Sequence, residues 1–458
     1  MIPVLLVIGM SLMLPAQNSR AEDLWAVFHL ALERDPQFAA AAAARDSALE
    51  SVPQAKAGFL PTVTAATGLN FNNQKVVYGN AAALGPTGSV SGQQMSYPSH
   101  NYSLNITQPI YHRETSLALR QADSRVGQAN AEYGAARQDL IVRSAQGYFD
   151  VLAALDSLDT AKAEKLAVGR QLDQSKQRFE VGIIAITDVH EAQAGYDLAV
   201  AQEIAAENQV ANAREALRAI IGAAPSDALA PLGDENLPLV STEPASADRW
   251  ADTALAQNLT LEATRAQVET ARNQVEIQRS GHYPHIDAVG STSLQKLSGG
   301  SAAGSTETDS TVIGLQISIP LYQGGIISSR IRQSGADLAR AQDLLEQEQR
   351  ATVLSARKSY LGVIAGISQV KALRQAVISN QSALQATEAG YQVGTRTIVD
   401  VLNSQRLLFA AERDYSQSRY NYVLNTLRLK QAAGQLNDAD LQAINTWLGE
   451  NKGKGAAP

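Results

Sequence analysis

The chain of 458 residues contains an internal repeat, in which the second half resembles the first. This repeat limits the possible folds more than any other feature of the sequence. Residues 31–61 match residues 254–284 at one constant offset. Residues 148–222 match residues 360–434 at a second constant offset. Such a repeat is typical of an architecture built from copies of one supersecondary unit. Each half is therefore expected to fold by the same plan.

In each half the predicted plan begins with a helix and continues with two strands. Helices are expected at residues 24–56, where Pro36 interrupts the pattern, and at residues 250–279. Apolar and polar residues then alternate, as they do in a strand with one apolar and one polar face. The alternating positions are Val63, Ala65, Thr67, Leu69 and Phe71, then Tyr102, Leu104 and Ile106, and in the second half Ile313, Leu315, Ile317 and Ile319.

The remaining strand, at residues 284–295, has a weaker pattern because His285 and Asp287 lie on its polar side. Segments rich in Gly, Ser and Asn separate the paired strands at residues 72–100 and 296–310. These two segments are expected to be exposed hairpin loops.

Each half continues with a long helix. Residues 113–181 and 325–393 contain no proline, and at 1.5 Å per residue each could reach roughly 100 Å. Breaks are expected at residues 182–187 and 394–397, followed by a second helix of about 35 residues. Many positions on these helices are Ala, Ser or Gln, which lets helices approach closely or face water inside a channel. The returning helices are expected to end near Gly222 and Gly434.

Composition excludes several classes of protein. The formal net charge is −7 with no basic stripe, so nucleic acid is not an expected partner. The absence of cysteine excludes disulfides, thiolate metal sites, cysteine nucleophiles and an N-terminal lipid anchor on Cys. Aromatic residues make up only 5%, which is low for a globular core of this size and favours long packed helices.

The N-terminal segment resembles an export signal. The apolar run at residues 2–14 is shorter than the roughly 20 residues that span a bilayer, and Ser19-Arg20-Ala21 fits a cleavage site. Residues 1–21 are therefore predicted to be a signal peptide, although no Lys or Arg precedes the apolar run; the alternative is a buried N-terminal helix. Since no later segment holds about 18 consecutive apolar residues, any membrane insertion is expected through a β-barrel.

The predicted fold is mainly α with a β-barrel. Four strands cannot close a barrel, because single-chain barrels start at eight, so the chain must pool strands with copies of itself. The predicted organisation is a first repeat at residues 22–222, a linker at 223–248, a second repeat at 249–448 and a flexible tail at 449–458. Strand counting alone leaves a dimer with 8 strands and a trimer with 12 strands open.

Several motifs resemble those of the TolC family over nearly the whole mature chain. They are Phe59-Leu60-Pro61, Gln108-Pro109-Ile110-Tyr111, Arg178-Phe179-Glu180-Val181-Gly182, Ile186-Thr187-Asp188-Val189, Pro320-Leu321-Tyr322-Gln323-Gly324-Gly325 and the run from Gly390 to Leu402. The resemblance implies a homotrimer with a 12-stranded barrel in the outer membrane of a Gram-negative bacterium. It also implies a periplasmic α-helical coiled-coil tunnel, a periplasmic adaptor, and an inner-membrane pump or ABC exporter.

The expected function is the exit duct of a tripartite efflux or type I secretion system that exports drugs or proteins. The turns at the far ends of the long helices would form the periplasmic entrance, which needs a latch to stay closed. Four candidate latch residues gather there: Thr187, Asp188, Tyr391 and Arg396. The Arg396 guanidinium can bind Asp188 or Thr187, and the Tyr391 hydroxyl can donate to Asp188. The alternative is a solvated pair worth about 0–1 kcal/mol.

A second candidate site is a ring of carboxylates. In a trimer, Asp400 would occur three times around one axis and select for cations. The resemblance implies a second Asp three residues later, but this chain has Asn403, so weaker block by polyvalent cations is expected. The alternative role for Asp400 is to cap a helix. The predicted adaptor-docking tips are Val181, Gly182, Ile183, Val393, Gly394 and Thr395.

No catalytic or cofactor site is expected. His282 and His285 lack a third ligand, Lys452-Gly453-Lys454-Gly455 lacks the context of a phosphate-binding loop, and no nucleophile elbow is present. The paired carboxylates Asp234-Glu235 lie in the linker and are expected to be solvated rather than catalytic. Two other function classes stay open: a general open porin, which would not need long helices, and a soluble periplasmic coiled-coil scaffold, which would not need alternating strands.

Overall fold

The computed structural model describes residues 22–76, 93–233, 237–240, 242–301 and 304–449. The predicted signal peptide, Asp234-Glu235 and residues 450–458 of the predicted tail lie outside these ranges. The chain divides into two compact units, each drawn from both repeats. The helical unit comprises the described parts of Met1–Ala41, Gly134–Asn258 and Arg350–Pro458. The strand unit comprises the described parts of Ala42–Tyr133 and Leu259–Gln349.

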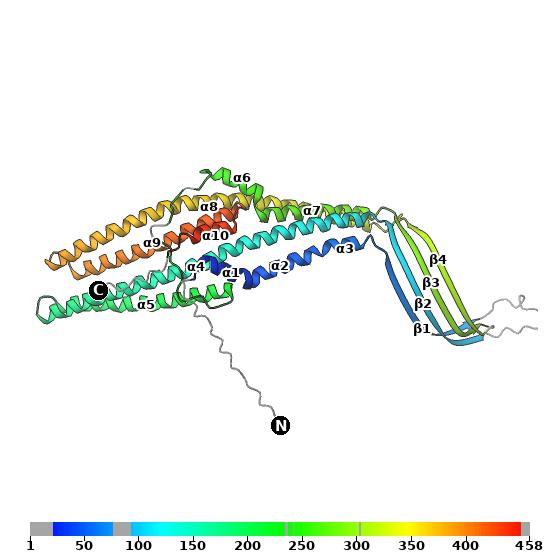
Figure 1. Ribbon diagram of the computed structural model, residues 1–458, viewed down its shortest axis with the longest axis horizontal. Helices are drawn as coiled ribbons and strands as arrows, with labels where there is room; N and C mark the ends of the chain where they lie inside the picture. Colours follow the sequence, from blue (N-terminus) through cyan, green and yellow to red (C-terminus); the bar gives the residue numbers. More distant parts are fainter. Residues whose placement is uncertain (1–21, 77–92, 234–236, 241, 302–303, 450–458) are drawn as a thin grey trace, which may run out of the picture. The chain divides into compact units, whose positions relative to one another are not determined.

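The strand unit holds one antiparallel sheet in the order β1-β2-β3-β4 (Figure 1). Its strands are β1 (Thr62–Val76), β2 (Gln93–Tyr111), β3 (His285–Ser301) and β4 (Gly304–Ser318). The register places Val63 opposite Ile106, and Gly290 opposite both Ile106 and Ile313. The alternating apolar positions therefore share one face across all four strands, as the sequence predicts. A sheet of this kind suits one chain's share of a barrel whose outer face meets lipid.

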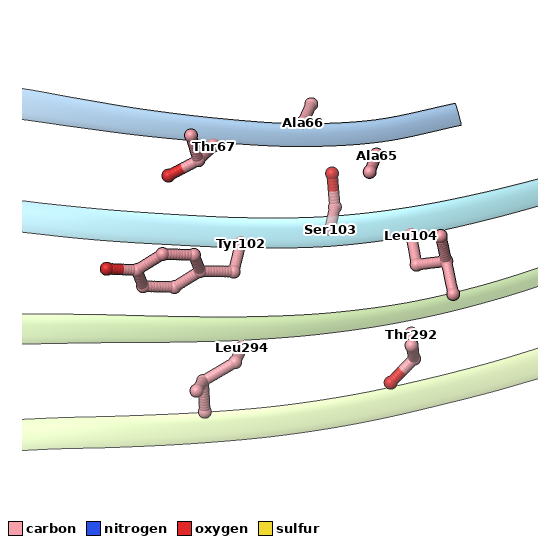
Figure 2. A pocket seen from close by; sticks show the side chains of 8 residues that line it. All are labelled: Ala65, Ala66, Thr67, Tyr102, Ser103, Leu104, Thr292 and Leu294. Atoms are coloured by element: carbon pink, nitrogen blue, oxygen red, sulfur yellow. The ribbon is translucent and has the colours of Figure 1, made fainter.

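Large apolar side chains on this face are exposed in the single chain: Val63, Leu69, Phe71, Tyr102, Leu104, Ile106, Ile313, Leu315 and Ile317. A hollow of about 390 Å³ lies on this face. Figure 2 shows the small side chains of Ala65, Thr67 and Thr292 beside Tyr102, Leu104 and Leu294, which line it. Ala66 and Ser103, which also line the hollow, project to the opposite side of the sheet (Figure 2).

The strands are longer than predicted, so the prediction of loops at residues 72–100 and 296–310 is wrong for much of their length. β1 and β2 stay paired from Thr62↔Thr107 to Val76↔Gln93. In the second hairpin the strands leave only residues 302–303 between them. The hydrogen bonds between strands join backbone groups, so polar residues can extend a strand as well as apolar ones. Cross-strand pairs support the extension, including the Lys296–Glu307 ion pair at 3.1 Å.

Two histidines and two carboxylates lie close together where β2 ends and where β3 and helix α4 (Arg113–Glu180) begin. His112 Nε2 lies 2.9 Å from Asp287 Oδ1, and His285 Nε2 lies 3.0 Å from Glu114 Oε1. The two imidazole rings are 4.9 Å apart. The sequence analysis singles out His285 but misses this cluster. Within the described ranges, no group of three or more His, Asp or Glu residues is arranged to hold a metal ion.

The strand unit also contains α3 (Ser51–Ala57) and α7 (Leu259–Ser280), and α2 (Pro36–Leu49) passes from one unit to the other. The first predicted helix is thus split at Asp35 and again at Glu50. Both long helices, α4 (Arg113–Glu180) and α8 (Ile326–Gln392), also pass from one unit to the other. Their ends agree with the predicted ranges to within one residue.

The rest of the helical unit consists of α1 (Leu24–Arg34), α5 (Ile186–Ile221), α6 (Ala247–Gln257), α9 (Ile398–Ala432) and α10 (Asp438–Asn445). In Figure 1, α5 returns beside α4 and α9 returns beside α8. Both halves contain short helices, then two strands, a long helix and a returning helix, which is the duplication expected from the repeat, although three helices precede the strands in the first half and two in the second. α10 has no counterpart among the described residues of the first half.

The single helix predicted at residues 250–279 is wrong, because the backbone is extended at Asn258 between α6 and α7. The Asn258 side chain donates to the Ala432 carbonyl oxygen at 3.0 Å. Gly434, in the left-handed conformation with φ of 72°, lies directly against the Gln257–Asn258 peptide. Packing against the end of α9 therefore sets this break, and no proline marks it in the sequence.

The core of the helical unit gathers around Tyr148 and Phe149 of α4. Both are fully buried, and the Phe149 ring stacks on Tyr420 of α9 at 5.6 Å. The Tyr148 hydroxyl donates to the Ala230 carbonyl oxygen at 2.7 Å, and burial raises the pKa of this phenol well above its ordinary value. Ala230 belongs to the predicted linker. This part of the linker is therefore buried in the helical unit.

One helix among the described residues, α8, has a stretch that could cross a membrane by length and composition alone. Only 11% of that stretch is buried in the single chain. A single helix that passes such a test is weak evidence against the expectation that the chain has no membrane-spanning helix.

Candidate functional site

The two candidate tips are built by the same local chemistry in both repeats. At the end of α4, the Ile183 N–H donates to the Arg178 carbonyl at 2.9 Å and the Gly182 N–H donates to the Phe179 carbonyl at 2.9 Å. This double pattern closes a helix with a left-handed residue, and Gly182 has φ of 75°. No atom lies within 4 Å of a Cβ added at Gly182, so a side chain would fit there. The position favours glycine because of its positive φ and not for lack of space.

The end of α8 repeats the pattern. The Thr395 N–H donates to the Gly390 carbonyl at 2.9 Å, and the Gly394 N–H donates to the Tyr391 carbonyl at 3.2 Å. Gly394 has φ of 79°. The tips expose apolar side chains: Val181, Ile183 and Val393 are 70%, 71% and 76% accessible. The predicted docking residues therefore form two narrow protruding turns.

Asp400 secures the start of α9. Its carboxylate accepts from the Thr397 N–H and hydroxyl, both at 2.9 Å, while the Thr397 hydroxyl accepts from the Asp400 N–H at 3.2 Å. This capping box satisfies backbone donors at the helix start. The hydrogen bonds from Thr397, aided by the charge of Arg396, hold the pKa of Asp400 below its ordinary value. The capping role considered from sequence is thus present, and the carboxylate stays charged.

Asn403 lies one turn further along α9 and is exposed. Its Oδ1 accepts from Arg406 Nη2 at 2.6 Å. Any acidic group introduced at this position would therefore have a guanidinium beside it.

The four predicted latch residues lie at the two turns, but the single chain joins only two of them. Thr187 Oγ1 lies 3.5 Å from Asp188 Oδ1, the limit of a hydrogen bond. In the described part of the chain, no hydrogen bond or ion pair joins Asp188 to Arg396 or to Tyr391. Arg396 is exposed, and the Tyr391 hydroxyl is buried without a hydrogen-bond partner.

A residue that the sequence analysis did not assign does connect the two turns. The Arg178 guanidinium, near the end of α4, lies over the Tyr391 ring near the end of α8, with its central carbon 4.8 Å from the ring centroid. This is a cation–π contact. Arg178 stands in one of the motifs quoted for the resemblance, but its partner could not be known before the helix ends were placed together.

Nothing at the turns suggests bond-making chemistry. The site consists of two glycine turns, exposed apolar tips, a capped carboxylate and two arginines that make weak contacts. Such contacts can hold two helical hairpins together and yet be broken by a docking partner.

Comparison with known proteins identifies the family of the chain. The family model "Outer membrane efflux protein" matches residues 27–223 and 250–435, which covers most of both repeats. The outer membrane protein TolC of Vibrio cholerae is 38% identical over 93% of this chain and 94% of its own length. The protease secretion protein PrtF of Dickeya chrysanthemi is 28% identical over 97% of this chain and 95% of its own.

Among solved structures, the CmeC outer membrane channel of Campylobacter jejuni superimposes with a TM-score of 0.74. It covers 98% of both chains at 15% identity, which shows the shared fold. The chain therefore belongs to the outer membrane efflux protein family and is an outer-membrane exit duct that extends into the periplasm.

Proposed function

We propose that three copies of this chain form one closed 12-stranded barrel and one continuous helical tunnel. The supporting observation is the four-stranded sheet, whose apolar face is exposed and in which β1 and β4 are edge strands. Unpaired strand edges are not tolerated in lipid, because each unsatisfied backbone group costs several kcal/mol there. Pairing β1 of one copy with β4 of the next removes every edge. A trimer is typical of the family.

The helical turns form the gate at the periplasmic end of this duct. Asp188 and Arg396 carry opposite charges and have no ion pair within the described part of their own chain. In the closed assembly they pair with each other across helical hairpins, with Thr187 and Tyr391 as neutral hydrogen-bonding groups. Because each such pair is weak, the gate can be opened from outside.

Three Asp400 carboxylates around the tunnel axis form a cation-selective ring. The capping hydrogen bonds fix each carboxylate near the start of α9 and keep it ionised at neutral pH. A ring of fixed negative charges favours cations in the constriction. Asn403 adds no second ring.

A periplasmic adaptor docks on the protruding tips and opens the gate, and an inner-membrane pump or ABC exporter loads the duct. Family members work with partners of these classes. The exposed valines and isoleucine beside Gly182 and Gly394 offer apolar contact at turns where another backbone can approach closely. The pump selects the cargo, so both drugs and secreted proteins fit the same duct.

The test is single-channel conductance in planar bilayers, with wild type measured beside Arg396→Ser. The proposal expects a small wild-type conductance that rises clearly in the variant. A large wild-type conductance that the substitution leaves unchanged would identify an open porin and refute the gate. Failure to insert into bilayers, with the protein absent from outer-membrane fractions, would instead favour the soluble scaffold.

A further inference from the structure

The two repeats differ most informatively at the last turn of their long helices. Arg178 of the first repeat corresponds to Gly390 of the second, and Phe179 corresponds to Tyr391. The backbone hydrogen bonds of the two turns are the same. The side chains have therefore diverged on a conserved local backbone, and both differences concern the contact between the turns.

Each difference has a visible consequence. Arg178 places its guanidinium on the Tyr391 ring at 4.8 Å. At Gly390, an added Cβ would lie 2.7 Å from Arg396 Cγ, which is too close for any real contact. The missing side chain thus leaves room for the Arg396 side chain to lie along the end of α8.

Within the single chain, the Tyr391 ring and not its hydroxyl makes the contact with the end of α4. The hydroxyl oxygen is buried and has no hydrogen-bond partner in the described part of the chain. Over the same ranges, Arg178 forms no ion pair that would explain its position. A guanidinium over an aromatic face is attracted by the ring quadrupole, without any need for the hydroxyl.

We infer that Arg178 is a positioning residue of the gate, which holds the Tyr391 ring and so ties the end of α4 to the end of α8 in the closed duct. This inference rests on the proposed gate. Losing a contact of this kind should raise the ratio of open to closed channel about twofold to fivefold per chain, which corresponds to about 0.5–1 kcal/mol.

The experiment measures open probability in planar bilayers for Arg178→Gln, with Lys176→Gln as the matched control. Lys176 is exposed on the same turn of α4, and its substitution removes the same charge without touching Tyr391. Arg178→Gln is then repeated in Tyr391→Phe and Tyr391→Leu backgrounds. Phenylalanine keeps the aromatic face, whereas leucine removes it. Arg396→Ser is measured in the same series.

The inference expects Arg178→Gln to raise opening at least twofold in wild type and in Tyr391→Phe, but to add nothing in Tyr391→Leu. Lys176→Gln should behave like wild type. If Arg178→Gln matches Lys176→Gln while Arg396→Ser opens the channel, the gate stands and the role of Arg178 is refuted. An equal effect in the phenylalanine and leucine backgrounds also refutes it, since the ring would not matter. If Arg396→Ser has no effect either, the proposed gate itself fails.

Discussion

Replacing Gly434 by alanine should destabilise the helical unit much more than the same change at Gly222, its counterpart in the first repeat. Both glycines follow a returning helix and adopt the left-handed conformation, with φ of 72° and 67°. The conformational cost of alanine is therefore nearly equal, about 1–2 kcal/mol at each position. The two sites differ only in what a new methyl group would meet.

At Gly222 the added Cβ would lie 3.2 Å from the Arg34 Cβ, which a small shift relieves. At Gly434 it would lie 2.0 Å from the Gln257 carbonyl oxygen and 2.5 Å from its carbon. These are backbone atoms, so the end of α9 must move away. Overpacking of this kind costs about 1–3 kcal/mol. Losing the Asn258 hydrogen bond to Ala432 adds about 0.5–1.5 kcal/mol.

The expected difference between the two alanine variants is therefore about 2–4 kcal/mol, with Gly434→Ala the less stable. Denaturant unfolding in detergent, followed by far-ultraviolet circular dichroism, measures it directly. The repeat supplies the control, because conformation and substitution are the same at both sites. Equal midpoints for the two variants would show that the contact with the Gln257 peptide does not constrain α9, and the reasoning would be wrong.

Two further substitutions test other parts of the structure. Asp35 is 3% exposed and binds Arg143 through two hydrogen bonds, of 2.9 and 3.1 Å, so Asp35→Asn should cost about 3 kcal/mol at pH 7. Burial opposes ionisation of Asp35, but Arg143 and the Phe38 N–H outweigh it and lower the pKa of this carboxyl group. The stabilisation is therefore fully present above about pH 4 and is lost as the pH falls through the lowered pKa. The difference in denaturant midpoint between wild type and Asp35→Asn should accordingly be smaller at pH 3 than at pH 7. Asn403→Asp should strengthen block of the channel by a trivalent cation only severalfold, because Arg406 neutralises part of the new charge. Equal block of wild type and variant would show that a carboxylate at position 403 does not form a second acidic ring.

The ends of the long helices could be predicted because local chemistry determines them. A proline-free run followed by glycine leads to the left-handed closures seen at Gly182 and Gly394. Strand identity could also be predicted, since alternation reports which face is apolar. Strand length could not, because polar residues near Lys296 and Glu307 pair as readily as apolar ones once the backbone ladder is set.

What the sequence could not reveal depends on partners far along the chain. The break at Asn258 is set by the end of α9, and the cluster of His112 with Asp287 exists only because β2 and β3 are neighbours. The contact of Arg178 with Tyr391 is of the same kind. In each case the residues can be read from the sequence, but which of them contact each other is known only from the three-dimensional fold.

The divergence between the repeats extends to the helix that follows each turn. The Thr397–Asp400 capping box precedes and secures the first turn of α9, whereas the N-cap residue of α5 is Ala185, whose methyl group cannot accept a hydrogen bond. A cap contributes about 1 kcal/mol, so the first turn of α5 is held less firmly than that of α9. Thr187 and Asp188 lie in this weaker turn, and Tyr391 and Arg396 flank the turn before the firmer one. In the proposed gate, the side formed by the start of α5 is therefore held less firmly than the side formed by the start of α9, although the turns before the two helices have the same backbone hydrogen bonds.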